Sequence, residues 1–177
     1  ISEKVIEDIL TSDKSIISDV ISVHHSDLSL IARQKIVSSG KLDMLYLYKD
    51  EMLLIELKVV PFYAEIINQI NNYEVDLTEL QKQNKLIKSK IRKIILVTGA
   101  KPNDYRICTE HNIVILIYKP EDILSKYYEN FKELSAFLKI QSGDYGVVRL
   151  GLIKSTLIYL GEGIELKEIC RIENKSE

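Results

Sequence analysis

The stretch that most constrains the fold of this chain runs from Gly40 to Tyr73 and reads as two strands followed by a helix. In the second strand side chains alternate between faces, so one face is wholly aliphatic while Glu56 and Lys58 share the other. A carboxylate and an ammonium group in so apolar a strand are costly unless they are paired or hold a cation. The preceding strand is apolar on both faces except for Asp43 near its start. The stretch therefore carries its few polar groups on two neighbouring strands.

The length of the turn between these strands decides whether Asp43 meets Glu56. With Lys49 and Asp50 as a two-residue loop, Asp43 lies directly across from Glu56, whereas a four-residue loop places it across from Lys58 on the same face. Facing cross-strand residues lie roughly 4.5–5.5 Å apart at Cβ, where like charges repel. We therefore expect a positive charge beside the two carboxylates. Lys58 supplies part of it, and a divalent cation would supply it more fully.

A helix is predicted from about Phe62, directly after Pro61, to about Lys90. Gln69 and Tyr73 are four residues apart on this helix, so they lie on one face and can reach the same site from the side.

This ordered set of residues resembles the PD-(D/E)XK nuclease superfamily. The matching positions are Asp43 for the first Asp of the motif, Glu56-Leu57-Lys58 for its E-x-K, and Gln69-x-x-x-Tyr73 for the Q-x-x-x-Y helix motif of RecB-like and NucS-like members. Residues 32–34 and 40–43 resemble the R-Q … G-R-[IV]-D run of NucS-type endonucleases, with Lys41 in place of the usual Arg. Leu42 replaces the nominal Pro, as is common in the superfamily.

The resemblance implies an α/β fold with a restriction-endonuclease-like αβββαβ core, in which helices flank a mixed central sheet. We expect residues 1–119 to form this core, and residues 120–177 to add a C-terminal helix and a β-rich tail packed on it. The expected helices are 1–10, 62–90, 102–111 and 120–138, and the expected strands are 30–38, 41–48, 51–60, 93–97 and 113–118. Residues 11–28 read as a loop with a short helical or extended piece.

The resemblance also implies hydrolysis of a DNA phosphodiester with Mg²⁺ or Mn²⁺ as cofactor. Asp43, Glu56 and the backbone carbonyl of Leu57 are the expected metal ligands. Lys58 would act on the attacking water, and Gln69 and Tyr73 would orient the water, Lys58 or the scissile phosphate.

Three further positions are assigned by the same resemblance. Arg33 and Lys41 are expected to contact DNA, although Arg33 reads equally well as a solvated edge charge. The superfamily often places a Glu from its first helix near the metal, and Glu3 matches that position because it precedes apolar residues by three and seven. Glu7 is its competitor, and an acidic first helical turn explains either residue equally well.

Composition excludes several other classes. A net charge of −2 gives no global basic surface, so any nucleic-acid surface is local. Cys108 and Cys170 fit neither a zinc site nor an iron–sulfur cluster, and the adjacent His24 and His25 do not converge on one ion. No stretch approaches the ~20 apolar residues of a membrane span. We expect a cytoplasmic protein without a membrane partner, and a homodimer is compatible with the sequence.

Two other interpretations stay open. The chain could be a nuclease-like fold retained as a nucleic-acid-binding or assembly module without catalysis. It could also be a plain α/β protein in which Asp43, Glu56 and Lys58 form a structural salt-bridge cluster. The effect of divalent metal on thermal stability separates catalytic metal binding from both.

Overall fold

The computed structural model describes the backbone of residues 1–142 and the side chains of residues 1–131. The chain divides into two compact units, Ile1–Pro120 and Glu121–Glu177, and the first holds every predicted site residue. Its elements are α1 (Glu3–Ser12), α2 (Lys14–Ile21), η1 (His25–Asp27), β1 (Leu28–Val37), β2 (Gly40–Tyr48), β3 (Glu51–Leu57), α3 (Glu65–Lys82), β4 (Lys90–Val97), α4 (Pro102–Glu110) and β5 (Ile113–Ile117). The helix α5 (Pro120–Ser142) follows, and the predicted β-rich tail lies outside the described residues.

The five strands form one sheet in the order β1-β2-β3-β4-β5. Neighbours among β1, β2 and β3 are antiparallel, whereas β3, β4 and β5 are parallel. The helix α3 connects β3 to β4 and α4 connects β4 to β5, as parallel strands require a crossover. The predicted α/β class, the αβββαβ element order and the mixed central sheet are confirmed.

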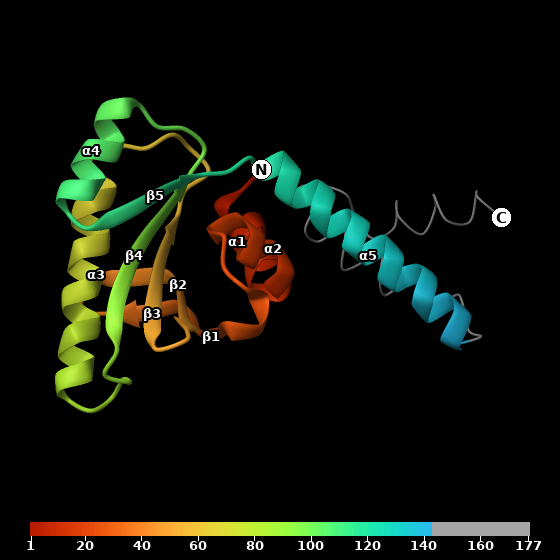
Figure 1. Ribbon diagram of the computed structural model, residues 1–177, viewed down its shortest axis with the longest axis horizontal. Helices are drawn as coiled ribbons and strands as arrows, with labels where there is room; N and C mark the ends of the chain where they lie inside the picture. The colour runs from red at the N-terminus through yellow and green to blue at the C-terminus, as the bar shows by residue number, and fades with distance from the viewer. Residues whose placement is uncertain (143–177) are drawn as a thin grey trace. The chain divides into compact units, whose positions relative to one another are not determined.

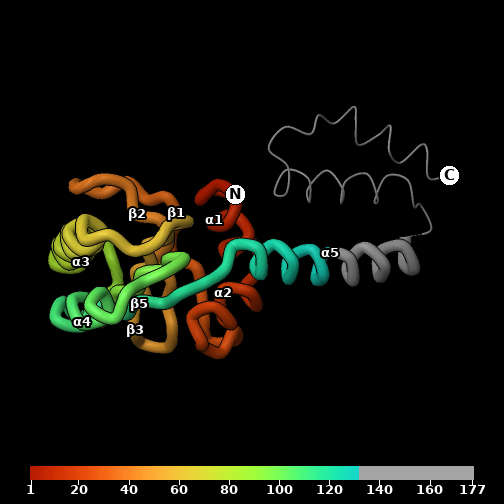
Figure 2. The backbone as a smooth tube through the Cα atoms, turned by 90° about the horizontal axis from the view of Figure 1, so that it is seen from above, coloured from red at the N-terminus to blue at the C-terminus, as the bar shows by residue number. Residues whose placement is uncertain are grey.

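Helices cover both faces of this sheet (Figures 1 and 2). The helices α3 and α4 lie on one face, and α1 and α2 lie on the other. On the α3 face, Ile66, Ile70 and Leu77 are fully buried in one apolar cluster with Leu54 and Ile95 of the central strands. Burial of such side chains stabilises the fold by roughly 1.5–3 kcal/mol each, which fixes α3 beside the carboxyl end of β3.

The segment 11–28 contains a helix where the sequence indicated mainly a loop. Asp13 begins α2 as its N-cap, with its side chain accepting a hydrogen bond from the Ser15 N–H at 3.0 Å. Ile16, Ile17 and Ile21 are buried, so the apolar residues of this segment follow a helical spacing. The scattered serines masked that spacing because serine is more usual at caps and turns than inside helices.

The helix α3 begins at Glu65, three residues later than predicted. The backbone beyond Leu57 stays paired to the end of β4 instead: the Lys58 N–H donates to Leu96 O at 2.9 Å, and the Phe62 N–H donates to Gly99 O at 2.8 Å. These two hydrogen bonds hold residues 58–62 beside residues 96–99, so the helix begins only after residue 62.

The helix also ends earlier than predicted, at Lys82 rather than about Lys90. Asn84 adopts the left-handed conformation with φ of 57°, and the Lys85 N–H closes the end by donating to Leu80 O at 2.9 Å. β4 then begins at Lys90, where it pairs with Glu51 at the start of β3. Lys90 thus lies at the opposite end of β3 from Glu56, whereas Lys93, at the end of the basic stretch Lys82–Lys93, pairs with Leu54 in the middle of β3.

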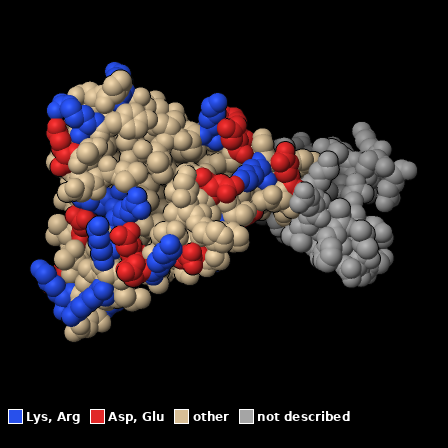
Figure 3. Space-filling view, viewed as in Figure 1, with Lys and Arg blue, Asp and Glu red and all other residues tan. Residues whose placement is uncertain are grey.

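The surface carries both signs of charge. Figure 3 shows Lys and Arg interspersed with Asp and Glu on the face in view, with no broad field of one sign. This mixture agrees with the net charge of −2. No helix within residues 1–142 combines the length and apolar character that a membrane span requires.

Candidate active site

The register of the β2–β3 hairpin brings Asp43 and Glu56 together. Tyr48 pairs with Glu51 across the two-residue turn, so the shorter of the two turn alternatives is confirmed. The ladder extends to Met44 and Ile55, and Asp43 and Glu56 are the next residues along each strand. Both side chains are buried, with 7% of Asp43 and none of Glu56 exposed. We call them the carboxylate pair.

Glu56 has one satisfied and one unsatisfied oxygen. Its Oε1 accepts from the Lys58 ammonium at 2.7 Å, whereas its Oε2 is buried without a hydrogen-bond partner. The neighbouring Asp43 cannot fill this role as a carboxylate, because an ionised carboxyl group only accepts. Burial and then the Asp43 charge raise the pKa of Glu56 to about 8, against the opposing effect of Lys58. The position therefore favours a positive ligand or a proton at Glu56.

Asp43 is held in one orientation from two sides. Its Oδ2 accepts from the Leu57 backbone N–H at 2.9 Å, and its Oδ1 accepts from Gln34 Nε2 at 3.4 Å. Burial raises the pKa of Asp43, although the Leu57 N–H and the charge of Lys58 act in the opposite direction. An ionised carboxylate offers about four lone-pair positions, so two acceptor positions stay open for another ligand.

Lys58 joins the carboxylate pair to the first helix. Its Nζ lies 2.7 Å from Glu56 Oε1 and 3.4 Å from Glu3 Oε1. Burial lowers the pKa of Lys58, but the charges of Glu56, Asp43 and Glu3 outweigh burial and leave the pKa above its usual value. Burial also raises the pKa of Glu3, which is about one-third exposed. Glu3 therefore lies at the rim, in contact with Lys58.

Glu7, the competing first-helix acid, lies deeper. Its side chain is 3% exposed and accepts hydrogen bonds from Arg33 Nε at 3.2 Å and from Gln34 Nε2. Arg33 also pairs with Asp8, so its guanidinium is held by two acids of α1. Burial and the charge of Asp43 raise the pKa of Glu7, against Arg33 and Gln34. Both first-helix acids are thus near the carboxylate pair, through different partners.

Gln69 and Tyr73 lie together on α3, as their spacing requires. Gln69 Nε2 donates to Tyr73 Oη at 3.1 Å, and Tyr73 Oη donates to the Lys41 carbonyl oxygen at 2.9 Å. The Tyr73 ring packs over Gly40, where an added Cβ would approach Tyr73 Oη to 3.2 Å. Tyr73 therefore fixes the start of β2, two residues before Asp43.

These residues surround one open pocket of about 550 Å³. All of its lining residues have polar or charged side chains, with cations beside acids and glutamines: Glu3, Lys4, Glu7, Arg33, Gln34, Lys41, Asp43, Lys58 and Gln69. Lys41 and Lys4 are exposed at its rim. The pocket thus collects most of the residues that the sequence assigned to metal, water or phosphate, while Glu56 and Tyr73 lie buried beneath it.

The donor set fits a divalent cation. The unpartnered Glu56 Oε2 and the open positions of Asp43 are oxygen donors, which Mg²⁺ and Mn²⁺ prefer. Within the part of the chain that the structure describes, no group of three or more Asp, Glu, His or Cys side chains is arranged to hold a metal ion, so a cation at the carboxylate pair would need water or substrate oxygens as its other ligands.

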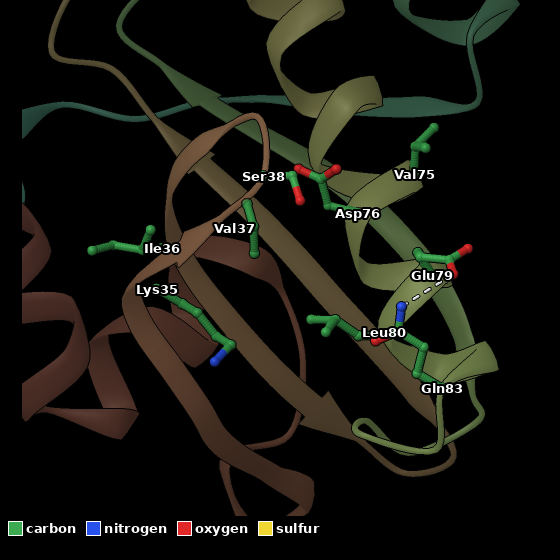
Figure 4. A pocket seen from close by; sticks show the side chains of 9 residues that line it. All are labelled: Lys35, Ile36, Val37, Ser38, Val75, Asp76, Glu79, Leu80 and Gln83. Atoms are coloured by element: carbon green, nitrogen blue, oxygen red, sulfur yellow. Dashed lines mark hydrogen bonds between the residues drawn. The ribbon is translucent and has the colours of Figure 1, made fainter.

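A second pocket, of about 460 Å³, lies between β1 and α3 (Figure 4). Ile36 and Val75 stand exposed at its edge, with 80% and 65% of their surface accessible. The pocket contains none of the predicted site residues. The residues with candidate chemistry line the first pocket instead.

Comparisons with known proteins bear on the fold. No protein-family model and no curated protein sequence matches the chain. Among solved structures, the chain is similar to a repair endonuclease from Pyrococcus abyssi, with a TM-score of 0.52 and 16% identity, over 68% of this chain and 48% of that chain. It also matches a complex of EndoMS with double-stranded DNA, with a TM-score of 0.46 and 18% identity, over 60% of this chain and 42% of that chain. A third match is SfsA of Pyrococcus furiosus with Ca²⁺, with a TM-score of 0.33 and 18% identity, over 56% of this chain and 51% of that chain.

The likeness to the repair endonuclease, together with the topology, defines the class of the fold: it is the restriction-endonuclease-like α/β fold found in nucleases. The match spans about half of that endonuclease. Neither the Q-x-x-x-Y motif nor the roles of the other predicted residues are tested by this likeness.

The sequence interpretation left Gln34 without a role, although its amide contacts both Glu7 and Asp43. The turn of the β1–β2 hairpin could have indicated that Gln34 lies near Asp43. Val37 pairs with Gly40 across a two-residue turn, and counting back from that turn places Gln34 opposite Asp43. The left-handed backbone at Gln34, with φ of 48°, has no comparable signal in the sequence.

Proposed function

We propose that this protein is a nuclease that hydrolyses DNA phosphodiester bonds with Mg²⁺ or Mn²⁺. The observation that carries the proposal is the buried carboxylate pair with the unpartnered Glu56 Oε2 beside Lys58. It is supported by a fold shared with a repair endonuclease, which by itself is analogy at the level of the fold. The site is what makes the analogy specific, because two buried acids and a lysine are costly in a protein that does not use them.

In this proposal Asp43, Glu56 and the Leu57 carbonyl would hold the cation. A bound Mg²⁺ or Mn²⁺ lowers the pKa of a bound water and neutralises phosphate charge. The ammonium of Lys58 donates hydrogen bonds and offsets the negative charge that develops on the phosphoryl oxygens. Lys41 and Lys4 line the rim of the pocket, where they can contact a DNA backbone.

The helix α3 has a supporting role in the same proposal. Tyr73 fixes the Lys41 carbonyl, and Gln69, which donates to Tyr73, lines the same pocket as Lys58, where its amide can orient water or phosphate. This is the part of the proposal that assigns the protein to the RecB-like and NucS-like nucleases. Arg33 is proposed to reach phosphate only when it leaves Glu7 and Asp8, so we expect a smaller effect from it than from Lys41.

A cleavage assay tests the proposal. The full chain is incubated with labelled single-stranded, duplex, mismatched and branched DNA, in Mn²⁺, in Mg²⁺ and in chelator. We expect cleavage of at least one substrate in metal and none in chelator. Metal-independent binding without cleavage of any substrate would instead favour a nuclease fold kept as a binding or assembly module.

A further inference from the structure

Gln34 combines an unusual backbone with an unusual contact. Five residues other than glycine have positive φ among the described residues: Ser22, Gln34, Lys49, Asn84 and Asn112. Four of them lie at helix ends or in the β2–β3 turn, where this conformation closes a helix or reverses the chain. Gln34 alone of the five lies inside a strand. A left-handed residue with a side chain costs free energy, and it persists where the surrounding structure requires it.

The position of Gln34 explains what this backbone achieves. Gln34 lies between the cross-strand pairs Arg33–Met44 and Lys35–Leu42, and is therefore opposite Asp43. Its side chain is directed into the candidate site, where Nε2 contacts Glu7 Oε2 and lies 3.4 Å from Asp43 Oδ1. A single neutral amide thus stands between two buried acids from different elements.

The contact with Gln34 orients Asp43 beside Glu56, the other member of the carboxylate pair. Leu57 N–H holds Oδ2 and Gln34 holds Oδ1, so the plane of the carboxylate is fixed while acceptor positions remain on both oxygens. Gln34 has no charge with which to compete for a cation. Such an arrangement suits a residue that orients a metal ligand without binding the metal.

We propose that Gln34 is a positioning residue of the candidate site: its amide holds the carboxylates of Glu7 and Asp43 in one orientation, and the left-handed backbone directs it there. This inference rests on the proposed function, because orientation of Asp43 matters only if Asp43 binds a cation. It adds a residue to which neither the motif nor the comparisons give a role.

Two substitutions separate this role from a purely structural one. Gln34→Gly keeps the left-handed conformation without strain and removes the amide. Gln34→Asn also tolerates that conformation, but its amide is shorter by one methylene and falls short of the acids. Lys35→Ala is the matched control, because Lys35 is the next residue of β1, is exposed and lies outside the candidate pocket.

Mn²⁺ binding to the full chain is measured by titration calorimetry, and thermal unfolding is followed in chelator. We expect Gln34→Gly and Gln34→Asn to bind Mn²⁺ about 10- to 100-fold more weakly. In chelator Gln34→Gly should unfold close to the wild-type temperature, because the relief of left-handed strain offsets the loss of the amide's hydrogen bonds. Cleavage by both variants should recover at high Mn²⁺, because Glu56 and Lys58 are intact. Lys35→Ala should match wild type throughout.

These measurements distinguish a failure of the Gln34 inference from a failure of the proposed function. Wild-type Mn²⁺ affinity in both Gln34 variants would overturn the positioning role and leave the proposed function standing. Lower stability in chelator together with unchanged Mn²⁺ affinity would assign Gln34 a structural role only. A wild-type protein that does not bind Mn²⁺ would overturn the proposed function, and this inference with it.

Discussion

Glu56 is the most deeply buried charged side chain among the described residues. It is fully buried, it has an unpartnered oxygen, and burial followed by the Asp43 charge raises its pKa to about 8. A pKa above the usual value means that the ionised form is less favourable in the folded chain than in the unfolded one. Without metal, the ionised side chain therefore costs stability, whereas a cation at the same place would recover that cost.

Glu56→Gln tests this directly, because glutamine has nearly the same shape and can still accept from Lys58. We expect it to raise the free energy of unfolding of the metal-free protein by about 1 kcal/mol, since one pKa unit corresponds to about 1.4 kcal/mol. We also expect it to lose the stabilisation that Mn²⁺ gives wild type. Thermal unfolding in chelator and in Mn²⁺ measures both effects.

Glu51→Gln is the control for this experiment. Glu51 lies on the same strand, is partly exposed and faces Lys90 at 3.8 Å. It should leave the response to Mn²⁺ unchanged. A full Mn²⁺ response in Glu56→Gln would remove Glu56 from the metal site.

Substitutions of Tyr73 and Gln69 are expected to slow cleavage with only a small loss of stability. Tyr73→Phe removes the donor to the Lys41 carbonyl, and Gln69→Ala removes an amide that lines the pocket. Each variant should slow cleavage by about 10-fold or more, while the loss of one hydrogen bond costs about 1 kcal/mol of stability. Single-turnover cleavage and thermal unfolding measure the two effects.

Tyr63→Phe is a matched control for Tyr73→Phe, because Tyr63 is 41% exposed and lies outside the pocket. Wild-type rates in both α3 variants would mean that the pair supports the fold of β2 alone. The Q-x-x-x-Y resemblance would then carry no functional weight.

At the scale of elements, Lys93 joins three of them. Its ammonium lies 2.8 Å from Asn71 Oδ1 and 3.2 Å from Glu74 Oε1 of α3, and donates to the His111 carbonyl after α4 at 2.9 Å. The side chain is 7% exposed, so all three donors are used in a nearly dry position. In the sequence Lys93 is one of several basic residues between Lys82 and Lys93. Nothing in that stretch indicated that Lys93 would be the one buried lysine among them.

Lys93→Met keeps the length of the side chain and removes the ammonium. We expect a loss of about 2 kcal/mol in the free energy of unfolding, because hydrogen bonds of a charged group are lost and a carbonyl is left unpaired. Lys90→Met, which alters an exposed lysine of the same strand, should change stability by less than about 0.5 kcal/mol. Equal effects from the two substitutions in urea unfolding would contradict the role of Lys93.

The reactivity of Cys108, the buried cysteine of α4, measures how well α4 packs on the sheet. It is fully buried, and burial, then the charge of Asp104, raises the pKa of its thiol to about 11. Since the thiolate is the reactive form, Cys108 should react with iodoacetamide at pH 8 far more slowly than in denaturant. A Cys170→Ser variant leaves Cys108 as the remaining thiol. Equal rates in buffer and denaturant would show that α4 does not pack Cys108 into the apolar cluster.

The hairpin could be predicted from the sequence because its turn and pattern agree. Strand alternation placed Glu56 and Lys58 on one face, and both turn lengths considered kept Asp43 on that face. The structure has the two-residue Lys49–Asp50 turn, which places Asp43 opposite Glu56. The ends of α3 could not be predicted, because they depend on Gly99 and on the left-handed Asn84, both outside any local periodicity. The same holds for Gln34, whose contacts come from a helix and a strand that are distant in sequence.

At the scale of the molecule, the five-stranded sheet and the flanking helices give the restriction-endonuclease-like fold without a broad basic surface in the view of Figure 3. In the proposed function, the local polar pocket rather than net charge recognises the DNA. The packing of residues 120–177 on the core, a homodimer and a cytoplasmic location stay predictions of the sequence.

In the proposed function, the carboxylate pair and Lys58 cut DNA with a divalent metal. Glu56→Gln tests it best, because the variant is expected to fold at least as well as wild type. The measurement is single-turnover cleavage of the preferred DNA in Mn²⁺, with DNA binding followed in the same samples. We expect the variant to bind DNA as tightly as wild type or more tightly, since a negative charge is removed, and to cut at least about 100-fold more slowly. Cleavage by Glu56→Gln at the wild-type rate would contradict the account.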